Sequence, residues 1–450
     1  MTTKQIDLMN RASLVNIGVK LELKGHKNMF TKPYRKKEAL KIMILEDIKR
    51  RKKLKRSKSL NNVNAVKIQE NEEKNIRRSK SFTSFKKRSL KKNYSSVKDI
   101  SQIYDIDRGV YPMVSKLVAI GDIHGDLSVA IKSLKLAGVI EKSIPDNTRD
   151  INKINWTGGD TYVVQLGDQI DRVRPAKLYN NLCAENDEDL VSDEGSDLKI
   201  ISLFEKLHRQ AKQKSGALFS IFGNHELMNV DGDFRYVSPK EFHEFGNFFK
   251  GIREQNSNYP FGYKERLEAF KPGGILSKRL ALTRYSVLQV GSWIFVHGSI
   301  SPTCAKKYTL QDINSSIKNW LLGKSMDNIQ DLYHTDDDED SPFWSRIYSD
   351  MDEWDEDRSI QQFKETINNL NIRNLRNNSN VIKGMIMGHS PQFMYDKGIN
   401  SSYNNKIWRV DIGASRAFGE IDCSRREGNL RKVHVLVIED DSKFHIVKEN

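Results

Sequence analysis

The sequence predicts an α/β protein whose strands end in polar side chains. Short apolar runs of strand length alternate along the chain with stretches in which apolar residues recur at helical spacing. In addition, three of the apolar runs end at a glycine that is followed at once by a polar or charged residue. In an α/β architecture the carboxyl ends of such strands meet at one edge of the sheet, so we expect these side chains to form a single site.

The first strand leads into the stretch around which the chain is organised. Residues 117–120 are apolar and run into a turn that presents Asp122 and His124 between two glycines, Gly121 and Gly125. Asp122 and His124 are two residues apart, so both side chains can point to the same side. A carboxylate and an imidazole offered together suit a divalent metal. The alternative is a surface aspartate and a helix-capping histidine in an ordinary loop.

The next elements repeat this arrangement. The pattern after the first strand predicts a helix over 127–136, a strand over 161–166, a helix over 198–212 and a strand over 217–222. The earlier of these strands ends at a glycine and Asp168, with Asp171 and Arg172 close behind. The later one ends at a glycine, Asn224 and His225.

The second half of the chain adds two histidines in similar positions. An aromatic-rich helical region over 239–282 precedes strands expected over 284–290, 293–296, 385–387, 407–412 and 433–438. His297 directly follows the second of these strands, and His389 follows the third after one glycine.

Five strand ends thus offer oxygen and imidazole nitrogen donors and no thiolate. This donor set suits a pair of borderline-hard ions such as Mn, Fe or Zn, with one carboxylate bridging them. A lone buried histidine is more often a satisfied core residue than a ligand. Five such ends in this order make coincidence a poor explanation, and we therefore expect a dinuclear metal site.

The motifs resemble those of a known family. They are G-D-I-H-G-D at 121–126, G-D-Q-I-D-R at 167–172, G-N-H-E at 223–226, H-G-S-I-S-P at 297–302 and G-H-S-P at 388–391. This set resembles the calcineurin-like metallophosphoesterase superfamily, and within it the phosphoprotein phosphatase family. Asp126 and the segment 223–236 are more similar to its bacterial-type, Shewanella-like branch. The resemblance covers roughly residues 115–440.

The resemblance implies a fold and a ligand set. The fold would be a β-sandwich flanked by helices in four layers (α/β/β/α). Asp122 and His124 would bind a first ion, and Asp168 would bridge it to a second. The second ion would also be held by the remaining ligands, Asn224, His297 and His389.

The resemblance also assigns the residues that act on the substrate. His225 would be the general acid that protonates the leaving alkoxide, and Asp171 would orient it. Arg172 and Asn224 would hold phosphate oxygens. Arg346 lies in a Trp-Ser-Arg context similar to the family's second phosphate-binding arginine, with a surface ion pair as the alternative. Arg235 is a further candidate, with a structural role as the alternative.

The implied chemistry is direct in-line attack on phosphorus by a metal-bridging water or hydroxide. Two departures from the family pattern concern the loops around this site. The family commonly has a glycine where this chain has Val173, which affects the pose of Arg172, and it commonly has a second glycine where this chain has Ser299. Neither change removes an expected ligand.

Three functions follow as hypotheses. The first is a metal-dependent phosphoprotein phosphatase acting on phosphoserine or phosphothreonine, with phosphotyrosine as a further substrate class. The second is a small-molecule phosphoesterase such as a dinucleoside polyphosphate hydrolase, for which a closed pocket would replace an open groove. The third is a weakly active binding protein that is anchored by a basic tail.

The charge distribution predicts two unlike parts. The net charge is +15, yet residues 1–100 hold 29 Lys+Arg against 9 Asp+Glu, so the rest of the chain is slightly acidic. We expect a basic extension of low order over 1–110 and a catalytic domain over 111–450, with acidic insertions near 185–197 and 336–357. The extension could contact an acidic partner, anionic lipid or nucleic acid.

The remaining composition bears on location. The three cysteines are widely separated and form no C-x-x-C pair, which is typical of a reducing compartment. No apolar run approaches the roughly 20 residues of a membrane span, and no signal-peptide core follows Met1. We therefore expect a cytoplasmic protein, although the basic clusters could also serve nuclear import.

Overall fold

The computed structural model describes most of the predicted catalytic domain. The described residues are 109–174, 193–252, 259–335, 338–349, 356–374, 381–418 and 432–449. The predicted basic extension lies outside them except for its last two residues, so its boundary and its partners stay predictions. No helix in these ranges is long and apolar enough to cross a membrane.

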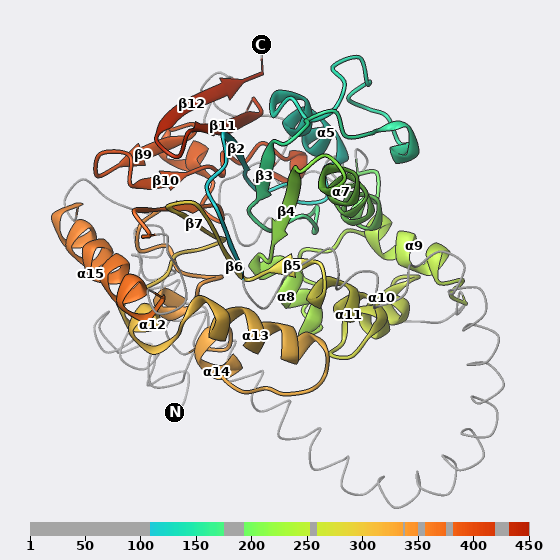
Figure 1. Ribbon diagram of the computed structural model, residues 1–450. Coiled ribbons are helices and arrows are strands. Elements are labelled where there is room, and N and C mark those ends of the chain that lie inside the picture. Colours follow the sequence, from blue (N-terminus) through green and yellow to red (C-terminus); the bar gives the residue numbers. More distant parts are fainter. Residues whose placement is uncertain are drawn as a thin grey trace, which may run out of the picture. The chain divides into compact units, whose positions relative to one another are not determined.

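Two six-stranded sheets form the centre of this domain (Figure 1). The first sheet has the order β12 (Lys443–Lys448), β11 (His434–Glu439), β2 (Lys116–Ile120), β3 (Tyr162–Gln165), β4 (Ala217–Ile221) and β5 (Arg284–Tyr285). The second has the order β1 (Val110–Tyr111), β6 (Val287–Val290), β7 (Trp293–Val296), β8 (Gly384–Met387), β10 (Ile407–Arg409) and β9 (Asn400–Ser402).

Apolar side chains from both sheets meet between them. One buried cluster joins Ala119 and Phe219 of the first sheet to Phe295 and Ile386 of the second. A second cluster packs the outer face of the first sheet against α5 (Leu127–Leu136) and α7 (Asp197–Lys212). A third packs the outer face of the second sheet against α12 (Pro302–Lys307), α13 (Leu310–Leu321) and α15 (Glu356–Asn374). Strands buried on both faces explain the nearly continuous apolar runs, and the expected four layers are confirmed.

Parallel pairing brings the predicted strand ends together. In the first sheet β2, β3 and β4 are parallel, with Val118 opposite Val163 and Val163 opposite Leu218. In the second sheet β7, β8 and β10 are also parallel, with Val296 opposite Met387. Each sheet therefore presents several carboxyl ends at one edge, which is where an α/β fold places its ligands.

The remaining helices lie in the region between β4 and β5 and beyond β7. They are α8 (Asn224–Val230), α9 (Pro239–Phe248), α10 (Tyr263–Phe270), α11 (Ile275–Ala281) and α14 (Ile329–Leu332). The first four include the helical region that the sequence predicts over 239–282. A buried cluster that includes Phe245, Phe270 and Trp320 holds this helical layer together.

One expected strand is divided between the two sheets. The apolar run over 284–290 forms β5, which pairs with β4, and β6, which pairs with β7. The chain crosses at Ser286, where the side chain of Asn314 accepts hydrogen bonds from the backbone N–H groups of Ser286 (2.7 Å) and Val287 (3.1 Å). This contact comes from α13, distant in sequence, so the local pattern could not reveal it.

The described end of the first acidic stretch is not a solvated loop. Residues 185–192 lie outside the described residues, but Asp193 and Asp197 are buried. Asp197 begins α7 and forms an ion pair of 2.8 Å with the buried guanidinium of Arg266. A basic partner elsewhere in the chain thus allows an acidic residue to enter the interior.

The environment of His434, at the start of β11, predicts loss of stability in acid. Burial, followed by the positive charge of Lys448, lowers the pKa of His434 to about 4. Because an unfolded histidine titrates near pH ~6.5, the stability contributed by neutral His434 is lost as the pH falls from about 6.5 to 4. Across that window the free energy of unfolding should fall by on the order of 1 kcal/mol more in the wild type than in His434→Gln. Urea denaturation at each pH measures this.

The matched control is His445→Gln on the neighbouring strand β12, where the imidazole is largely exposed and 3.3 Å from Glu439. This variant should follow the wild-type pH dependence. Parallel curves for His434→Gln and the wild type would contradict the assignment.

Candidate metal centre

The six predicted ligand residues converge at the strand ends. Asp122 and His124 follow β2, Asp168 follows β3, Asn224 begins α8 after β4, and the two histidines of the second sheet, His297 and His389, follow β7 and β8. All six are buried. The sandwich thus contributes ligands from both sheets to one place.

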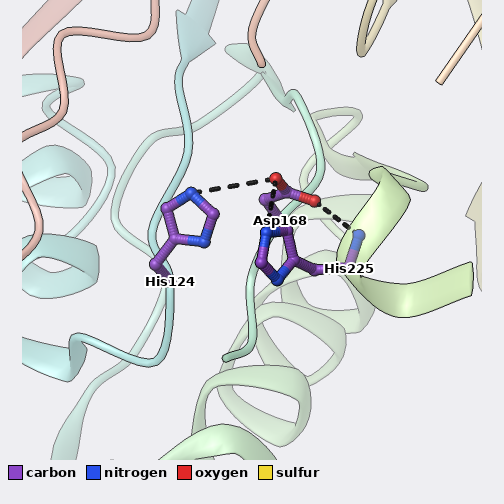
Figure 2. A group of neighbouring side chains, drawn as sticks. All are labelled: His124, Asp168 and His225. Carbon is purple, nitrogen blue, oxygen red and sulfur yellow. Dashed lines mark hydrogen bonds and ion pairs between the residues drawn. The ribbon is translucent and has the colours of Figure 1, made fainter. Parts of the chain in front are cut away.

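Asp168 lies among several of the histidines of this site, and Figure 2 shows it between His124 and His225. Its Oδ2 atom is 3.7 Å from Nε2 of His124, 3.8 Å from Nε2 of His225 and 3.2 Å from Nε2 of His297. Two sets of donor atoms that could each hold an ion share this residue, one with His124 and His225 and one with His297 and His389. A carboxylate shared by two sets is what a bridging ligand requires.

The backbone at the ligands departs from ordinary strand geometry. His124, Asp168 and His389 have φ angles of 46°, 48° and 67°. These angles lie in the left-handed region, which residues other than glycine seldom adopt. Such conformations persist only where the surrounding structure enforces them, and they gather at functional sites.

Glu226 holds the loop that carries Asp168. Its carboxylate accepts hydrogen bonds from the backbone N–H groups of Asp168 (3.1 Å), Gln169 (2.7 Å) and Gly223 (2.8 Å). A side chain at position 223 would overlap Oδ1 of Asp168, so the loop also needs glycine there. The glutamate of the G-N-H-E motif therefore joins two strand ends, a role that the motif alone does not disclose.

The histidines of this site suit metal binding. Nδ1 of His297 donates to the backbone oxygen of Leu166 at 2.6 Å, so its Nε2, which faces Oδ1 of Asn224 at 2.9 Å, is the nitrogen that would bind a metal. Burial disfavours the charged ring, but the neighbouring Asp168 carboxylate outweighs it and raises the pKa of His297. Burial, followed by the charge of Arg174, lowers the pKa of His124 well below its usual range. Burial and Arg346 do the same to the pKa of His389. Neutral imidazoles are the form that binds metal.

Asp411 is an acidic neighbour that the sequence analysis missed. It lies two residues beyond β10 and is buried, and its Oδ2 atom has no hydrogen-bond partner among the described residues. Burial, followed by the charges of Asp411 and Asp168, raises the pKa of Asp122 well above its usual range. Bound cations would offset this repulsion, so the buried carboxylate oxygens and the neutral imidazoles of His124 and His389 fit a divalent-metal site. The missed signal was a further strand end, hidden because the strand over 407–412 was expected to run past it.

The predicted general acid and its partner are in contact. Nδ1 of His225 is 2.8 Å from Oδ2 of Asp171, and Asp171 is completely buried. The ring of Tyr236 packs against the imidazole with 4.7 Å between centroids. Nε2 of His225 faces Asp168, so the proton-carrying edge of the ring lies next to the metal ligands.

The arginines are placed differently from one another. Nε of Arg346 donates to Nε2 of His389 at 3.2 Å, which puts this guanidinium at the ligand cluster. Arg172 is buried, but among the described residues its guanidinium has only Asp126 within ion-pair distance, at 3.8 Å. Arg235 is exposed and is bound to Asp233 through Nε at 2.9 Å.

Arg174 is a second residue that the sequence analysis missed. Its Nη2 atom is 2.7 Å from both ring nitrogens of His124, and its guanidinium packs over the ring of Phe418 at 4.8 Å. The one sequence signal that could have indicated a role for Arg174 is its position two residues after Arg172 in the same turn.

The two departures from the family pattern fit the structure. In the loop after β3, Gly167, Asp168 and Asp171 have positive φ angles of 90°, 48° and 72°, whereas Val173 is outside that region, so valine is accommodated. The hydroxyl of Ser299 donates to the backbone oxygen of Ser345 at 3.2 Å. Neither residue displaces a ligand.

Comparisons with known proteins agree with this geometry. The family model described as calcineurin-like phosphoesterase matches residues 115–410. The chain is 31% identical over 363 residues to Shewanella-like protein phosphatase 2 of Arabidopsis thaliana, covering 74% of this chain and 78% of that protein. It is 26% identical over 302 residues to Shewanella-like protein phosphatase 1 of Plasmodium berghei, covering 67% of each.

A solved structure is similar as well. It is a cold-active protein-tyrosine phosphatase of a psychrophilic Shewanella species, with a TM-score of 0.47 and 18% identity, covering 78% of this chain and 84% of that one. The family model spans the five strand ends that carry the buried ligands. The resemblance inferred from the motifs is therefore confirmed, and the chain belongs to the calcineurin-like phosphoesterase family.

Proposed function

We propose that this chain is a metal-dependent phosphoprotein phosphatase that hydrolyses phosphoserine and phosphothreonine, with phosphotyrosine as a further substrate class. One observation carries the proposal. Asp168 lies among the imidazoles of His124 and His297, and the His225–Asp171 pair lies directly beside it. Relatives named as protein phosphatases favour a protein substrate over a small phosphoester, and over a binding protein without turnover.

Two ions, of Mn, Fe or Zn, would occupy the shared site. Asp122, His124 and Asp168 would hold one, and the remaining ligands, Asn224, His297 and His389, would hold the other together with Asp168. When bound, such ions supply Lewis-acid chemistry at the phosphoryl oxygens and make water a stronger acid.

The protein groups perform the other parts of the reaction. Arg346 offers N–H donors to the phosphate oxygens, and Arg172 and Asn224 are the other candidates for that task. His225 holds a proton on Nε2 and gives it to the leaving oxygen as the bond from that oxygen to phosphorus breaks. Water adds to phosphorus from the opposite side, so the products are inorganic phosphate and the free hydroxyl group of the substrate.

Metal removal tests the proposal most directly. Stripped protein should not hydrolyse p-nitrophenyl phosphate, and Mn²⁺ should restore turnover. The reason is that the cation polarises the phosphoryl oxygens and makes water a stronger acid. Asp168→Asn should lose turnover and lower the metal content measured by mass spectrometry. Rates on phosphoserine and phosphotyrosine peptides then show the preferred substrate class.

Asp441→Asn is the matched control for this experiment. Asp441 is a largely buried aspartate that accepts a hydrogen bond from the backbone of Ser292 at 3.0 Å, away from the ligands. It should keep the wild-type metal content. A fully loaded wild-type protein that hydrolyses none of the three substrates would refute the proposed function.

Replacing the proposed acid separates chemistry from metal binding. His225→Asn should lower kcat on a phosphoserine peptide by about 10²–10⁴-fold, the usual contribution of a general acid. Its metal content should stay at the wild-type level, since the six residues proposed as ligands, which do not include His225, all remain. Unchanged turnover would show that another group donates the proton.

Replacing Arg346 and replacing Arg235 should have different effects on phosphate binding. Arg346→Ala should lower kcat/KM and weaken inhibition by inorganic phosphate by about 10–100-fold, because a charge-assisted hydrogen bond is lost. Arg235→Ala, at an exposed position where the guanidinium is bound to Asp233, should change neither quantity. Testing Arg172→Ala and Arg174→Ala beside them shows which of the two guanidinium groups of this turn meets the substrate. Equal effects at Arg346 and Arg235 would contradict the role of Arg346.

A further inference from the structure

A buried ionic network lies behind His225 and includes residues that none of the motifs contains. At its centre is Arg266 of α10, whose side chain is completely inaccessible to solvent. Its Nη2 donates to Oδ1 of Asp171 at 3.0 Å, its Nη1 to Oδ2 of Asp197 at 2.8 Å, and its Nε to Oδ1 of Asn229 at 2.6 Å. Each nitrogen of the guanidinium therefore has a polar partner.

Asn229 closes the network around the same carboxylate. Its Nδ2 donates to both oxygens of Asp171 at 3.0 Å and to the backbone oxygen of His225 at 2.9 Å. Asp171 is therefore held on one oxygen by His225 and on the other by Arg266, with Asn229 bound to both. Rotation of the carboxylate away from the imidazole would break bonds to two other side chains at once.

The acids of this network already have a cation. Asp171, Asp197 and Glu241 lie close enough to one another to resemble a metal site. Burial and the neighbouring Asp197 raise the pKa of Glu241 well above its usual range, which favours its neutral form. The guanidinium of Arg266 then faces two carboxylates, and both accept its hydrogen bonds. This assigns the cluster to an arginine rather than to a metal ion.

The surroundings of Arg266 make its position costly unless it is paired. Its guanidinium carbon is 4.7 Å from the ring centroid of Phe245 and 5.2 Å from that of Phe270, both completely buried. A charge enclosed in this way needs strong partners, and the aromatic rings prevent it from turning toward solvent. The network is therefore rigid as well as complete.

We propose that Arg266 is a positioning residue for the general acid, which it serves by fixing the Asp171 carboxylate against Nδ1 of His225. With Nδ1 bound to Asp171, the transferable proton sits on Nε2, at the edge of the ring that faces the metal ligands. That proton moves to the leaving oxygen as the phosphorus–oxygen bond breaks. The inference rests on the proposed function, since it concerns the acid step of that reaction.

Leaving groups of different basicity distinguish this role from a merely structural one. p-Nitrophenolate leaves readily without a proton, whereas the alkoxide of serine needs one. Loss of the positioning contact should therefore slow the phosphoserine peptide far more than p-nitrophenyl phosphate. For Arg266→Met we expect kcat on the peptide to fall by about 10²-fold, and by less than about 10-fold on the nitrophenyl ester. The metal content should be unchanged.

The matched control is Arg284→Met. Arg284 is also a buried arginine, and it pairs with Glu205 at 3.3 Å and with the side chain of Gln169 at 2.6 Å, without contact to Asp171 or His225. Any loss of rate in this variant should be the same for both substrates. Arg266→Lys retains the charge but carries all its donors on one nitrogen, without the planar fork that reaches three separate partners, so its ratio of the two rates should lie between those of the wild type and Arg266→Met.

A double variant tests whether Arg266 acts through Asp171. Asp171→Asn should itself lower the peptide rate selectively, and adding Arg266→Met should not change the ratio of the two rates further. If Arg266→Met does not fold, the lysine variant decides the question. An unchanged ratio in the folded arginine variant would overturn the inference, and so would a further change in the double variant. A wild-type protein inactive on both substrates would instead refute the proposed function.

Discussion

A carboxylate removed from water must be matched by hydrogen bonds or positive charge, and Asp168 imposes this requirement on the whole site. It lies at the meeting point of both sheets, with three imidazoles around one oxygen and the backbone N–H of His225 on the other, at 3.0 Å. Glu226 supports the loop beneath it. The parallel register of β2, β3 and β4 is what brings these groups to one edge. The two sets of donors, and the reaction that follows from them, depend on that single buried group.

Much of this arrangement could be predicted from the sequence because its signals are local. A strand end carries its apolar run, its glycine and its ligand within about ten residues, and the helix over 127–136 appears with the same bounds in the structure. The candidate ligands stand at those strand ends, and the resemblance to the family supplied the pairing of His225 with Asp171. To place His297 and His389 of the second sheet in the same site, one further inference was needed: the carboxyl ends of the parallel strands of both sheets lie next to each other.

The features that could not be predicted depend on contacts between distant segments. Arg266 is one arginine among many in a helical region, and only the fold brings it to Asp171, 95 residues away in the sequence. Asn314 divides the run over 284–290 by hydrogen bonds from another helix. Arg172 and Arg174 lie in one turn, and side-chain packing rather than spacing decides which of them contacts His124. Motifs report the groups that perform chemistry, whereas the groups that orient them are recorded mainly in tertiary contacts.

The network at Arg266 has a consequence for the dynamics of the domain. It ties the loop after β3, the start of α7, α8 and α10 to one guanidinium. None of these segments can open without removing a hydrogen bond from a buried charged group, so they should exchange their amide hydrogens as one cooperative unit. The segment that aims the proton would then open only with its neighbours, and brief fraying of a single helix would not interrupt turnover.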